Sequence, residues 1–374
     1  MIGIPKIPLA PLILALALLA WAFPQHGQAQ AQAGQGEAQA RTGEGPGEVA
    51  QRRPLTVYTA MTATTAQLPL LAALKAGWPE GAEVKVEYWK NLEDLRALVL
   101  AGKGDVWVGH LETLSRAAAR GAPACLVAVT VWRKFYFVSA PLPTRNGPNR
   151  ATAYPADVTE LLGVAAKNSI TVTSSPQNSP QANLLEELKG AIGAFPTDSL
   201  PPQQLILELV RGQRQIALMP EPMASMAVSK SPNLKIIGSL EEEYSKHFGG
   251  DGLMPQAGVA VNLELASSQP GLVADLLAHM LKAATDLEGK PVSAKVALFP
   301  PEVAQAVGPE VLSASLSLEP LIVKAASEVK DQVTDFLILA APDLFEPGKA
   351  FPPNFYWDMA GSQGQPGSPA SDAR

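Results

Sequence analysis

The chain has one cysteine, Cys125, among its 374 residues, so it forms no internal disulfide and carries no CxxC motif or cysteine-rich metal site. Basic residues are also scarce: 29 lysines and arginines stand against 35 aspartates and glutamates, without a run of positive charge. Nucleic acids require a clustered basic face, so we expect no nucleic-acid partner. With four histidines and no GxSxG, HExxH or P-loop motif, we expect no catalytic residues, no metal and no cofactor.

The N-terminus predicts an export signal over residues 1–33. Lys6 precedes the apolar run "IPLAPLILALALLAWAF", and two "AQA" tripeptides at 29–31 and 31–33 offer small residues to a signal peptidase. A membrane anchor is the alternative, but the run is shorter than the roughly 20 residues that a spanning helix needs. Because Cys125 is far from the signal, we expect a periplasmic protein without a lipid anchor.

The rest of the chain divides by composition. Residues 34–53 and 359–374 have almost no large apolar side chains and predict a flexible leader and a disordered tail. Between them, strand-like runs such as "LTVYTA" and "DVWVGH" alternate with helical patterns, which is typical of parallel βαβ units. The irregular stretches "PLPTRNGPNRATAYP" and "EEEYSKHFGGDGLMPQ" predict two crossings between lobes. We therefore expect a first lobe over 54–145 and 243–358 and a second over 146–242.

Two longer patterns make further structural predictions. "ACLVAVTVWRKFYFVS" predicts one long β segment, with Cys125 as a small buried residue and with Arg133 and Lys134 on opposite faces near a crossing. "LEPLIVKAASEVKDQVTDFLILAAPDLF" predicts a long helical C-terminus.

Candidate binding residues follow the predicted strands, because ligands of open parallel sheets bind beyond the carboxyl ends of the strands. Thr62 and Thr64 lie in the threonine-rich loop "TAMTATTAQ", with Thr65 as the expected helix cap. They serve either as caps or as ligand contacts. His110 ends "DVWVGH" and is either a ligand contact or an ordinary polar residue. Glu112, in the first turn of the next helix, is explained by the helix dipole.

Two further loops offer candidates. In "TSSPQNSPQAN", Asn178 and Ser179 precede Pro180, a residue suited to the first position of a helix, so this loop is a cap, an anion site or both. In "IALMPEPMASMAV", Glu221 has a proline on each side, which favours extended backbone before a helix that starts at Pro222. We expect its carboxylate at the edge of the sheet and outside the core, where it binds a ligand donor, caps the helix or pairs with a cation.

These stretches resemble a known family. "GKGDVWVGHLETLSRAAARGAPACLVAV" and "LVRGQRQIALMPEPMASMAV" are similar to two signature stretches of the periplasmic substrate-binding proteins of ABC transporters, in the branch for nitrate, sulfonate, taurine and thiamine precursors. Asp105 and Glu221–Pro222 occupy the matching positions, and the likeness covers roughly residues 54–345. It implies an α/β fold of the type II periplasmic-binding-protein class, a two-lobed clamp in which each lobe is a mostly parallel sheet flanked by helices, with two hinge crossings.

The resemblance also implies a function. A monomer would capture one small solute, such as an oxyanion, a sulfonate or an amino-bearing compound, and deliver it to an ABC permease in the cytoplasmic membrane. Its ligand-binding residues would then be Thr62, Thr64, His110, Asn178, Ser179 and Glu221. A binding protein that reports to a receptor is the first alternative. An enzyme on the same fold is the second, although the fungal pyrimidine-precursor synthases of this architecture carry a cysteine-rich motif that this chain lacks.

Overall fold

The structure is a computed structural model that describes residues 53–143, 152–175, 180–348 and 351–359. The predicted signal peptide and nearly all of the predicted leader and tail lie outside these residues. None of the described helices is both long and apolar enough to cross a membrane.

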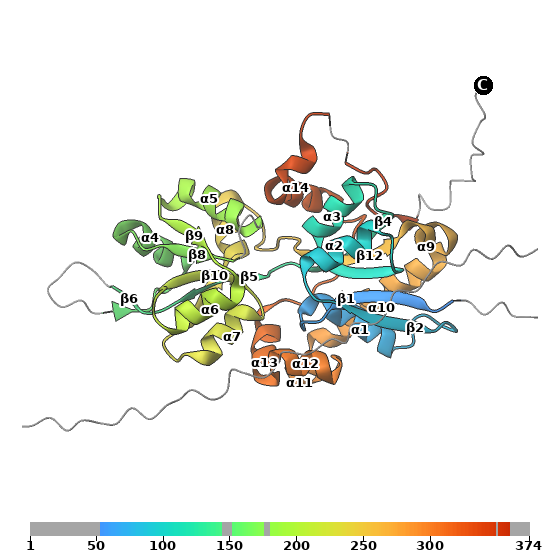
Figure 1. The fold of residues 1–374 in the computed structure, drawn as a ribbon, viewed down its shortest axis with the longest axis horizontal. Coiled ribbons are helices and arrows are strands. Elements are labelled where there is room, and N and C mark those ends of the chain that lie inside the picture. Colours follow the sequence, from blue (N-terminus) through green and yellow to red (C-terminus); the bar gives the residue numbers. More distant parts are fainter. Residues whose placement is uncertain (1–52, 144–151, 176–179, 349–350, 360–374) are drawn as a thin grey trace, which may run out of the picture. The chain divides into compact units, whose positions relative to one another are not determined.

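Six of the described strands form the first sheet, in the order β13-β4-β12-β3-β1-β2. Figure 1 labels β1, β2, β4 and β12 of this sheet. Strands β1, β2 and β3 pair in parallel, whereas β12 is antiparallel to both β3 and β4. The strands are β1 Leu55–Ala60, β2 Val84–Trp89, β3 Val106–His110, β4 Ala124–Val131, β12 Ala257–Asn262 and β13 Lys324–Ala325. We call this sheet and the helices packed on it lobe 1.

Five described strands form the second sheet, in the order β11-β5-β10-β8-β9. Strands β10, β8 and β9 pair in parallel, and β5 is antiparallel to both β10 and β11. The strands are β5 Phe135–Ser139, β8 Val172–Ser174, β9 Thr197–Ser199, β10 Ile216–Pro220 and β11 Lys235–Ser239. We call this sheet and the helices packed on it lobe 2. Strands β6 Leu142–Pro143 and β7 Thr152–Ala153 pair only with each other, in a separate two-stranded antiparallel sheet.

The two sheets share one topology. In each, the central antiparallel strand comes from a crossing: β5 enters lobe 2 directly after β4 of lobe 1, and β12 returns the chain to lobe 1. The crossings pair with each other, because the Met254 and Gln256 amides donate to the carbonyls of Trp132 (2.7 Å) and Val131 (2.8 Å). Each sheet therefore contains an antiparallel strand that follows directly from an element of the other lobe: β5 in lobe 2 follows β4, and β12 in lobe 1 follows helix α8 (Leu240–Phe248).

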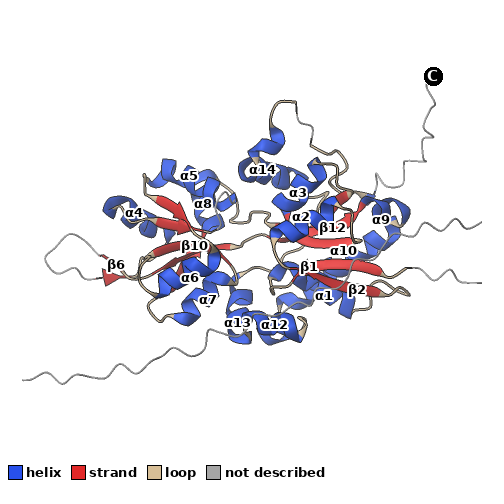
Figure 2. Cartoon of the chain, viewed as in Figure 1, coloured by secondary structure: helices blue, strands red, loops and turns tan. Residues whose placement is uncertain are grey.

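Helices cover both faces of each sheet (Figure 2). In lobe 1, α1 and α10 pack on one face, where Cys125 is buried as predicted, and α2 and α3 pack on the other. In lobe 2, α4, α5 and α8 lie on one face and α6 and α7 on the other. The helices up to the second crossing are η1 Thr65–Gln67, α1 Leu68–Lys75, α2 Leu92–Leu100, α3 Leu111–Ala119, α4 Val158–Asn168, α5 Pro180–Ile192, α6 Pro202–Val210, α7 Met223–Lys230 and α8 Leu240–Phe248.

The described helices after β12 are α9 Leu263–Ser268, α10 Pro270–Glu288, α11 Val292–Val296, α12 Pro301–Val307, α13 Pro309–Leu318, α14 Lys330–Ala340 and η2 Pro342–Phe345. Two of them, α13 and α14, link the lobes. Helix α13 packs against α7 of lobe 2, and α14 contacts both α3 of lobe 1 and α5 of lobe 2. The Asn183 side-chain amide on α5 donates to the Leu339 carbonyl on α14 (3.1 Å).

The long β segment predicted over 124–139 is instead two strands in different sheets. Between β4 and β5 the Lys134 and Phe135 amides donate to one carboxylate oxygen of Glu241, at 2.8 and 3.2 Å. Because the carboxylate satisfies amides that have left the first sheet, the chain can change sheets here. The first crossing therefore precedes the proline-rich stretch, and β5 belongs to lobe 2 although composition places the boundary at residue 145.

Two further stretches have a different secondary structure from the one predicted: the second irregular stretch and the C-terminal helix. Part of "EEEYSKHFGGDGLMPQ" is helical, since α8 begins after Ser239, whose hydroxyl accepts from the Glu242 amide (3.2 Å). The C-terminal helix is shorter than predicted, because α13 ends before Glu319 and α14 starts at Lys330. Glu319 precedes a proline and has φ −90° and ψ 124°, an extended backbone that ends a helix.

Candidate functional site

Glu221 lies between the end of β10 and the start of α7, where its flanking prolines place it. Its amide donates to the Lys134 carbonyl (2.9 Å), and its Oε1 accepts from the Ser225 hydroxyl (2.9 Å). The prediction that it lies outside the core is wrong, since the residue is only 1% exposed. Burial, together with the negative charge of Glu319, raises the pKa of Glu221 to about 7, although hydrogen bonds from Ser225 and Ser315 and the charge of Lys134 oppose the rise. The loop position is thus costly for an ionised carboxylate.

Glu319 and Lys134 form a buried ion pair next to Glu221. The Lys134 ammonium lies 3.4 Å from Oε1 of Glu319, and both side chains are almost fully buried. The other oxygen, Oε2, accepts a hydrogen bond from the Thr65 hydroxyl (2.6 Å). These three residues come from η1, the first crossing and the segment after α13. Together with Glu221 they form what we call the crossing cluster.

Glu319 is the residue that sequence reasoning missed. A signal was present, because Glu319–Pro320 repeats the acidic-proline pair of Glu221–Pro222. The helical pattern around it hid this signal. Lys134 was predicted near a crossing. Its partner Glu319 was not predicted, because it lies 185 positions away along the chain.

His110 ends β3 and stands just before α3, as predicted, and it is half-buried. Burial, together with the positive charge of Lys134, lowers the pKa of His110 to about 4. The imidazole is therefore neutral near pH 7, where it can donate or accept one hydrogen bond but brings no charge. The influence of Lys134 places His110 in the electrostatic field of the crossing cluster.

In the threonine-rich loop, the residue that caps the helix and the residue that contacts the crossing cluster are not the ones that were predicted. Thr62 is exposed and Thr64 is half-buried. Thr64, and not Thr65, caps η1, and its amide donates to the Gln67 side chain (3.1 Å). Thr65, which sequence reasoning treated as a cap, is the buried residue whose hydroxyl reaches Glu319. Of these three threonines, Thr65 is therefore the one joined to the crossing cluster.

Asn178 and Ser179 lie outside the described residues, so the structure leaves their predicted roles open. The residues around that gap are informative. Helix α5 starts at Pro180, as predicted, and both the Ser175 hydroxyl and the Gln181 Oε1 atom are buried without a hydrogen-bond partner among the described residues.

Several other buried polar atoms near the crossings also lack a partner within the described part of the chain. They are Oγ1 of Thr59, the residue before the last of β1, Oε2 of Glu221, and Nε2 of Gln256 in the second crossing. Nε1 of Trp132 and Nε of Arg133 in the first crossing, and Oε2 of Glu241, which binds that crossing, belong to the same set. Gln256 adjoins His110, because its carbonyl accepts from the Leu111 amide (3.1 Å). Buried polar groups are nearly always satisfied in proteins, by the chain itself, by water or by a bound group, so these atoms are the ones at which to test for a ligand.

Asp105, which matches a family position, has a structural role. Its carboxylate accepts from the Thr56 amide (2.7 Å) and pairs with the Arg53 guanidinium (2.6 Å). Its own amide donates to the Thr56 carbonyl (2.8 Å). Asp105 thus fixes the start of β1 against β3, at the end of the sheet opposite His110.

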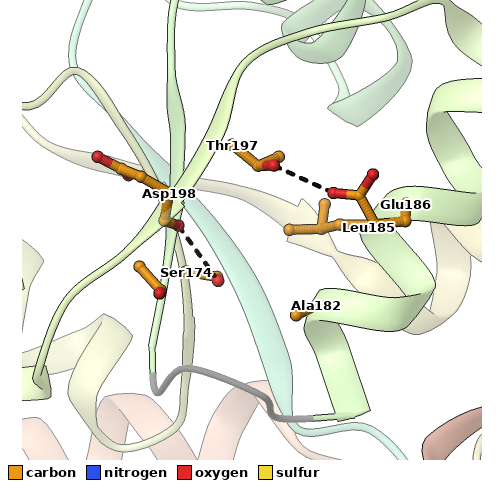
Figure 3. Close-up of a pocket in the computed structure, with 7 residues that line it drawn as sticks. Ser174, Ala182, Leu185, Glu186, Thr197 and Asp198 are labelled. Carbon is orange, nitrogen blue, oxygen red and sulfur yellow. Dashed lines mark hydrogen bonds between the residues drawn. The ribbon is translucent and has the colours of Figure 1, made fainter.

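A cavity of about 250 Å³ lies within lobe 2 (Figure 3). It is lined by residues of β8, α5 and β9, namely Ser174, Ala182, Leu185, Glu186, Thr197, Asp198 and Ser199. The Glu186 carboxylate and the Thr197 hydroxyl hydrogen-bond to each other across it (3.1 Å). None of the crossing-cluster residues lines this cavity. Its carboxylates are already paired, Glu186 with Lys189 and Asp198 with Arg214.

Comparison with solved structures identifies the fold. The chain is similar to an ABC transporter structure from Parabacteroides distasonis, with 15% identity, a TM-score of 0.60, and coverage of 82% of this chain and 99% of that one. It is also similar to the periplasmic aliphatic sulphonate binding protein SsuA from Escherichia coli (14% identity, TM-score 0.60, coverage 86% and 96%). A third is the periplasmic nitrate-binding protein NrtA from Synechocystis PCC 6803 (12% identity, TM-score 0.54, coverage 83% and 85%).

No family model and no curated protein matches the sequence. The chain therefore has the two-lobed α/β fold of ABC-transporter periplasmic binding proteins, as the resemblance predicted, at identities that show the fold alone.

Proposed function

We propose that the protein is an extracytoplasmic solute-binding protein that captures a small polar solute between its lobes and delivers it to an ABC permease in the cytoplasmic membrane. The crossing cluster carries this proposal, because lobe 1 supplies Thr65 and lobe 2 supplies Glu221 to one buried polar region. The solved structures with this fold support it, since they are described as transporter binding proteins for sulfonates and nitrate.

The unpartnered atoms explain why a solute would be needed for closure. Each buried donor or acceptor without a hydrogen bond costs about 1–3 kcal/mol. The arrangement described above leaves Thr59 Oγ1, Glu221 Oε2 and Gln256 Nε2 in that condition. A solute that supplies the missing partners stabilises this arrangement over one in which water reaches these atoms. Differential affinity of this kind is what drives closure of a two-state clamp.

Export from the cytoplasm is part of the same proposal. The N-terminal apolar run and the two "AQA" tripeptides support removal of a signal peptide, without attachment of a lipid. The intact mass of the protein purified from the periplasm checks this directly. We expect a mature chain that begins after residue 31 or 33, and a full-length chain recovered from the membrane fraction would contradict it.

A thermal-shift screen tests the solute-binding proposal. The mature protein is unfolded, freed of any carried ligand, refolded, and screened against oxyanions, alkylsulfonates, taurine, dicarboxylates, amines and pyrimidines. A solute at about 100 times its dissociation constant adds roughly 2.7 kcal/mol of stability, which shifts the melting temperature by several degrees. Stabilisation by one chemical class supports the proposal, and its loss in Thr65→Val places the solute at the crossing cluster. A screen without any stabilising compound would count against solute binding.

A further inference from the structure

The crossing cluster holds more negative than positive charge. The Lys134 ammonium is paired with Glu319 at 3.4 Å, and the second oxygen of Glu319 is occupied by the Thr65 hydroxyl. Glu221 receives a hydrogen bond from the Ser225 hydroxyl, which is neutral. Two buried carboxylates therefore share one ammonium group, and Glu221 is the one without a cation at hydrogen-bonding distance among the described residues.

The other titratable groups around Glu221 do not supply that cation. His110 is neutral because its pKa is lowered to about 4, and Arg133 pairs with Glu242 at 2.8 Å. The Tyr136 hydroxyl donates a hydrogen bond to the Leu318 carbonyl (2.8 Å), so it is not directed to Glu221. The remaining group, the Glu241 carboxylate, is also a buried acid: its Oε1 accepts from two amides of the first crossing, whereas its Oε2 has no hydrogen-bond partner among the described residues.

The Oε2 atom of Glu221 is the second and independent observation. Glu221 is 1% exposed, and its Oε2 atom has no partner with hydrogen-bond geometry within the described part of the chain. The buried Ser315 hydroxyl on α13 lowers the pKa of the carboxylate, but it is neutral and brings no positive charge. A buried carboxylate oxygen with neither a donor nor a cation is strongly disfavoured. Near its pKa of about 7 the carboxyl can hold a proton instead, but when it is ionised, an N–H group of a positively charged nitrogen supplies both the donor and the compensating charge.

Resting on the function proposed above, we propose that the solute carries a cationic nitrogen, such as a primary ammonium, an amidinium or a guanidinium group, and that Glu221 is the residue that selects it. This differs from the sulfonate and nitrate named for the similar structures. A purely anionic solute would find no unpaired positive charge here, because Lys134 is bound to Glu319, Arg133 to Glu242, and His110 is neutral. The unpartnered Nε–H group of Arg133 is the one donor of a charged side chain at the first crossing that the described residues leave open. An anionic group elsewhere on the solute remains compatible with the proposal.

Matched pairs of compounds test the proposal. Taurine is compared with isethionate, β-alanine with 3-hydroxypropionate, and short alkylamines and an alkylamidine with alcohols of equal length; nitrate serves as the bare anion. Binding is measured by calorimetry with the mature wild-type protein, with Glu221→Gln and with Glu243→Gln. Glu243 is a suitable control because it is a fully buried carboxylate of lobe 2 whose partners are Thr159, Lys246 and His247.

In at least one pair we expect the nitrogen-bearing compound to bind about tenfold or more tightly than its hydroxyl counterpart. Glu221→Gln should weaken that binding by roughly 10- to 100-fold, since a hydrogen bond to a charged group contributes about 1.5–3 kcal/mol, and Glu243→Gln should leave it unchanged. Wild-type affinity should also rise as the pH increases from about 6 to 8, because ionised Glu221 binds the cation.

Tight binding of isethionate or nitrate that Glu221→Gln leaves unchanged or strengthens would overturn this inference while leaving the proposed function intact. The same holds if affinity rises as the pH falls, because a protonated Glu221 would then be donating to an anion. Absence of binding by any compound would argue against the proposed function itself.

Discussion

The Nζ atom of Lys134, in the first crossing, lies 3.4 Å from Oε1 of Glu319, which follows α13, and the two residues are 185 positions apart. This contact ties the segment between the two sheets to the helices at the end of lobe 1. It also places a neutralised ion pair beside Glu221, whose pKa reflects the charges of both partners. The stability of the fold and the charge available to a solute therefore depend on the same residues.

Removing one partner of this pair should be strongly destabilising. Lys134→Met leaves Glu319 buried without its cation, and we expect the free energy of unfolding to fall by about 3–5 kcal/mol. Urea denaturation at pH 7 measures it. The control is Lys282→Met, which breaks an exposed pair with Asp286 and should change stability by less than about 0.5 kcal/mol. Equal effects of the two substitutions would show that Lys134 is not held in a buried pair.

Glu221 should make the solute-free protein less stable as the pH rises. Its pKa is raised from 4.5 to about 7 on folding, so the folded state binds more protons than the unfolded state between these values, and stability falls with increasing pH in that window. Glu221→Gln removes this dependence. The variant should match the wild type near pH 4 and exceed it by roughly 3 kcal/mol near pH 8.

The measurement is the difference in unfolding free energy between the two proteins at each pH. Taking the difference removes the contribution of other titrating groups, such as Glu241, because burial raises the pKa of Glu241 to about 7 in both proteins. A variant less stable than the wild type at pH 8 would mean that ionised Glu221 has a favourable partner within the protein. It would then have no need of a cation from the solute.

Gly258 should tolerate no side chain. A Cβ atom there would lie 2.3 Å from the carbonyl oxygen of Ala128, so β12 could not pair with β4 at this position. We expect Gly258→Ala to cost about 2–3 kcal/mol, because backbone atoms cannot move away as a flexible side chain can. Gly163→Ala is the control: its Cβ meets nothing within 4 Å on helix α4, and the change should be neutral or stabilising. Thermal unfolding of both variants checks the contrast.

The segment at 351–359 should be needed for stability, although it follows the last described helix. The Leu126 amide donates to the Phe355 carbonyl (2.6 Å), and the Trp357 amide donates to the Leu126 carbonyl (2.8 Å). The Phe355 and Trp357 side chains are buried. Truncation after residue 350 should therefore destabilise the protein by more than about 3 kcal/mol. Truncation after residue 359 should have little effect, and a comparable loss would contradict the predicted disordered tail.

The sequence predicted the fold where local pattern and topology agree. Alternating strands and helices, the proline at the start of α5 and the position of Glu221 between β10 and α7 all follow from short-range rules. The predicted long strand over 124–139 failed because the break depends on Glu241, a residue more than 100 positions away. Composition predicts the first crossing at the prolines after residue 140. The chain instead crosses at Lys134, where the Glu241 carboxylate accepts the hydrogen bonds that a neighbouring strand would otherwise accept.

The candidate site was predictable only in part. Glu221 was selected from its two prolines, but its burial was not, because it depends on Ser225, Glu319 and Lys134 packed around it. Thr65 and Glu319 meet across 254 positions, a separation that no local pattern can bridge. Pairs of this kind become visible only when both lobes and both crossings are in place.

A crystal structure of the refolded protein with its most strongly stabilising solute tests the central claim most directly. We predict that the solute lies at the crossing cluster, with a cationic nitrogen within hydrogen-bonding distance of Glu221 Oε2 and with contacts from residues of lobe 1. A solute bound instead in the lobe 2 cavity lined by Ser174, Glu186 and Asp198, with Glu221 untouched, would contradict the account.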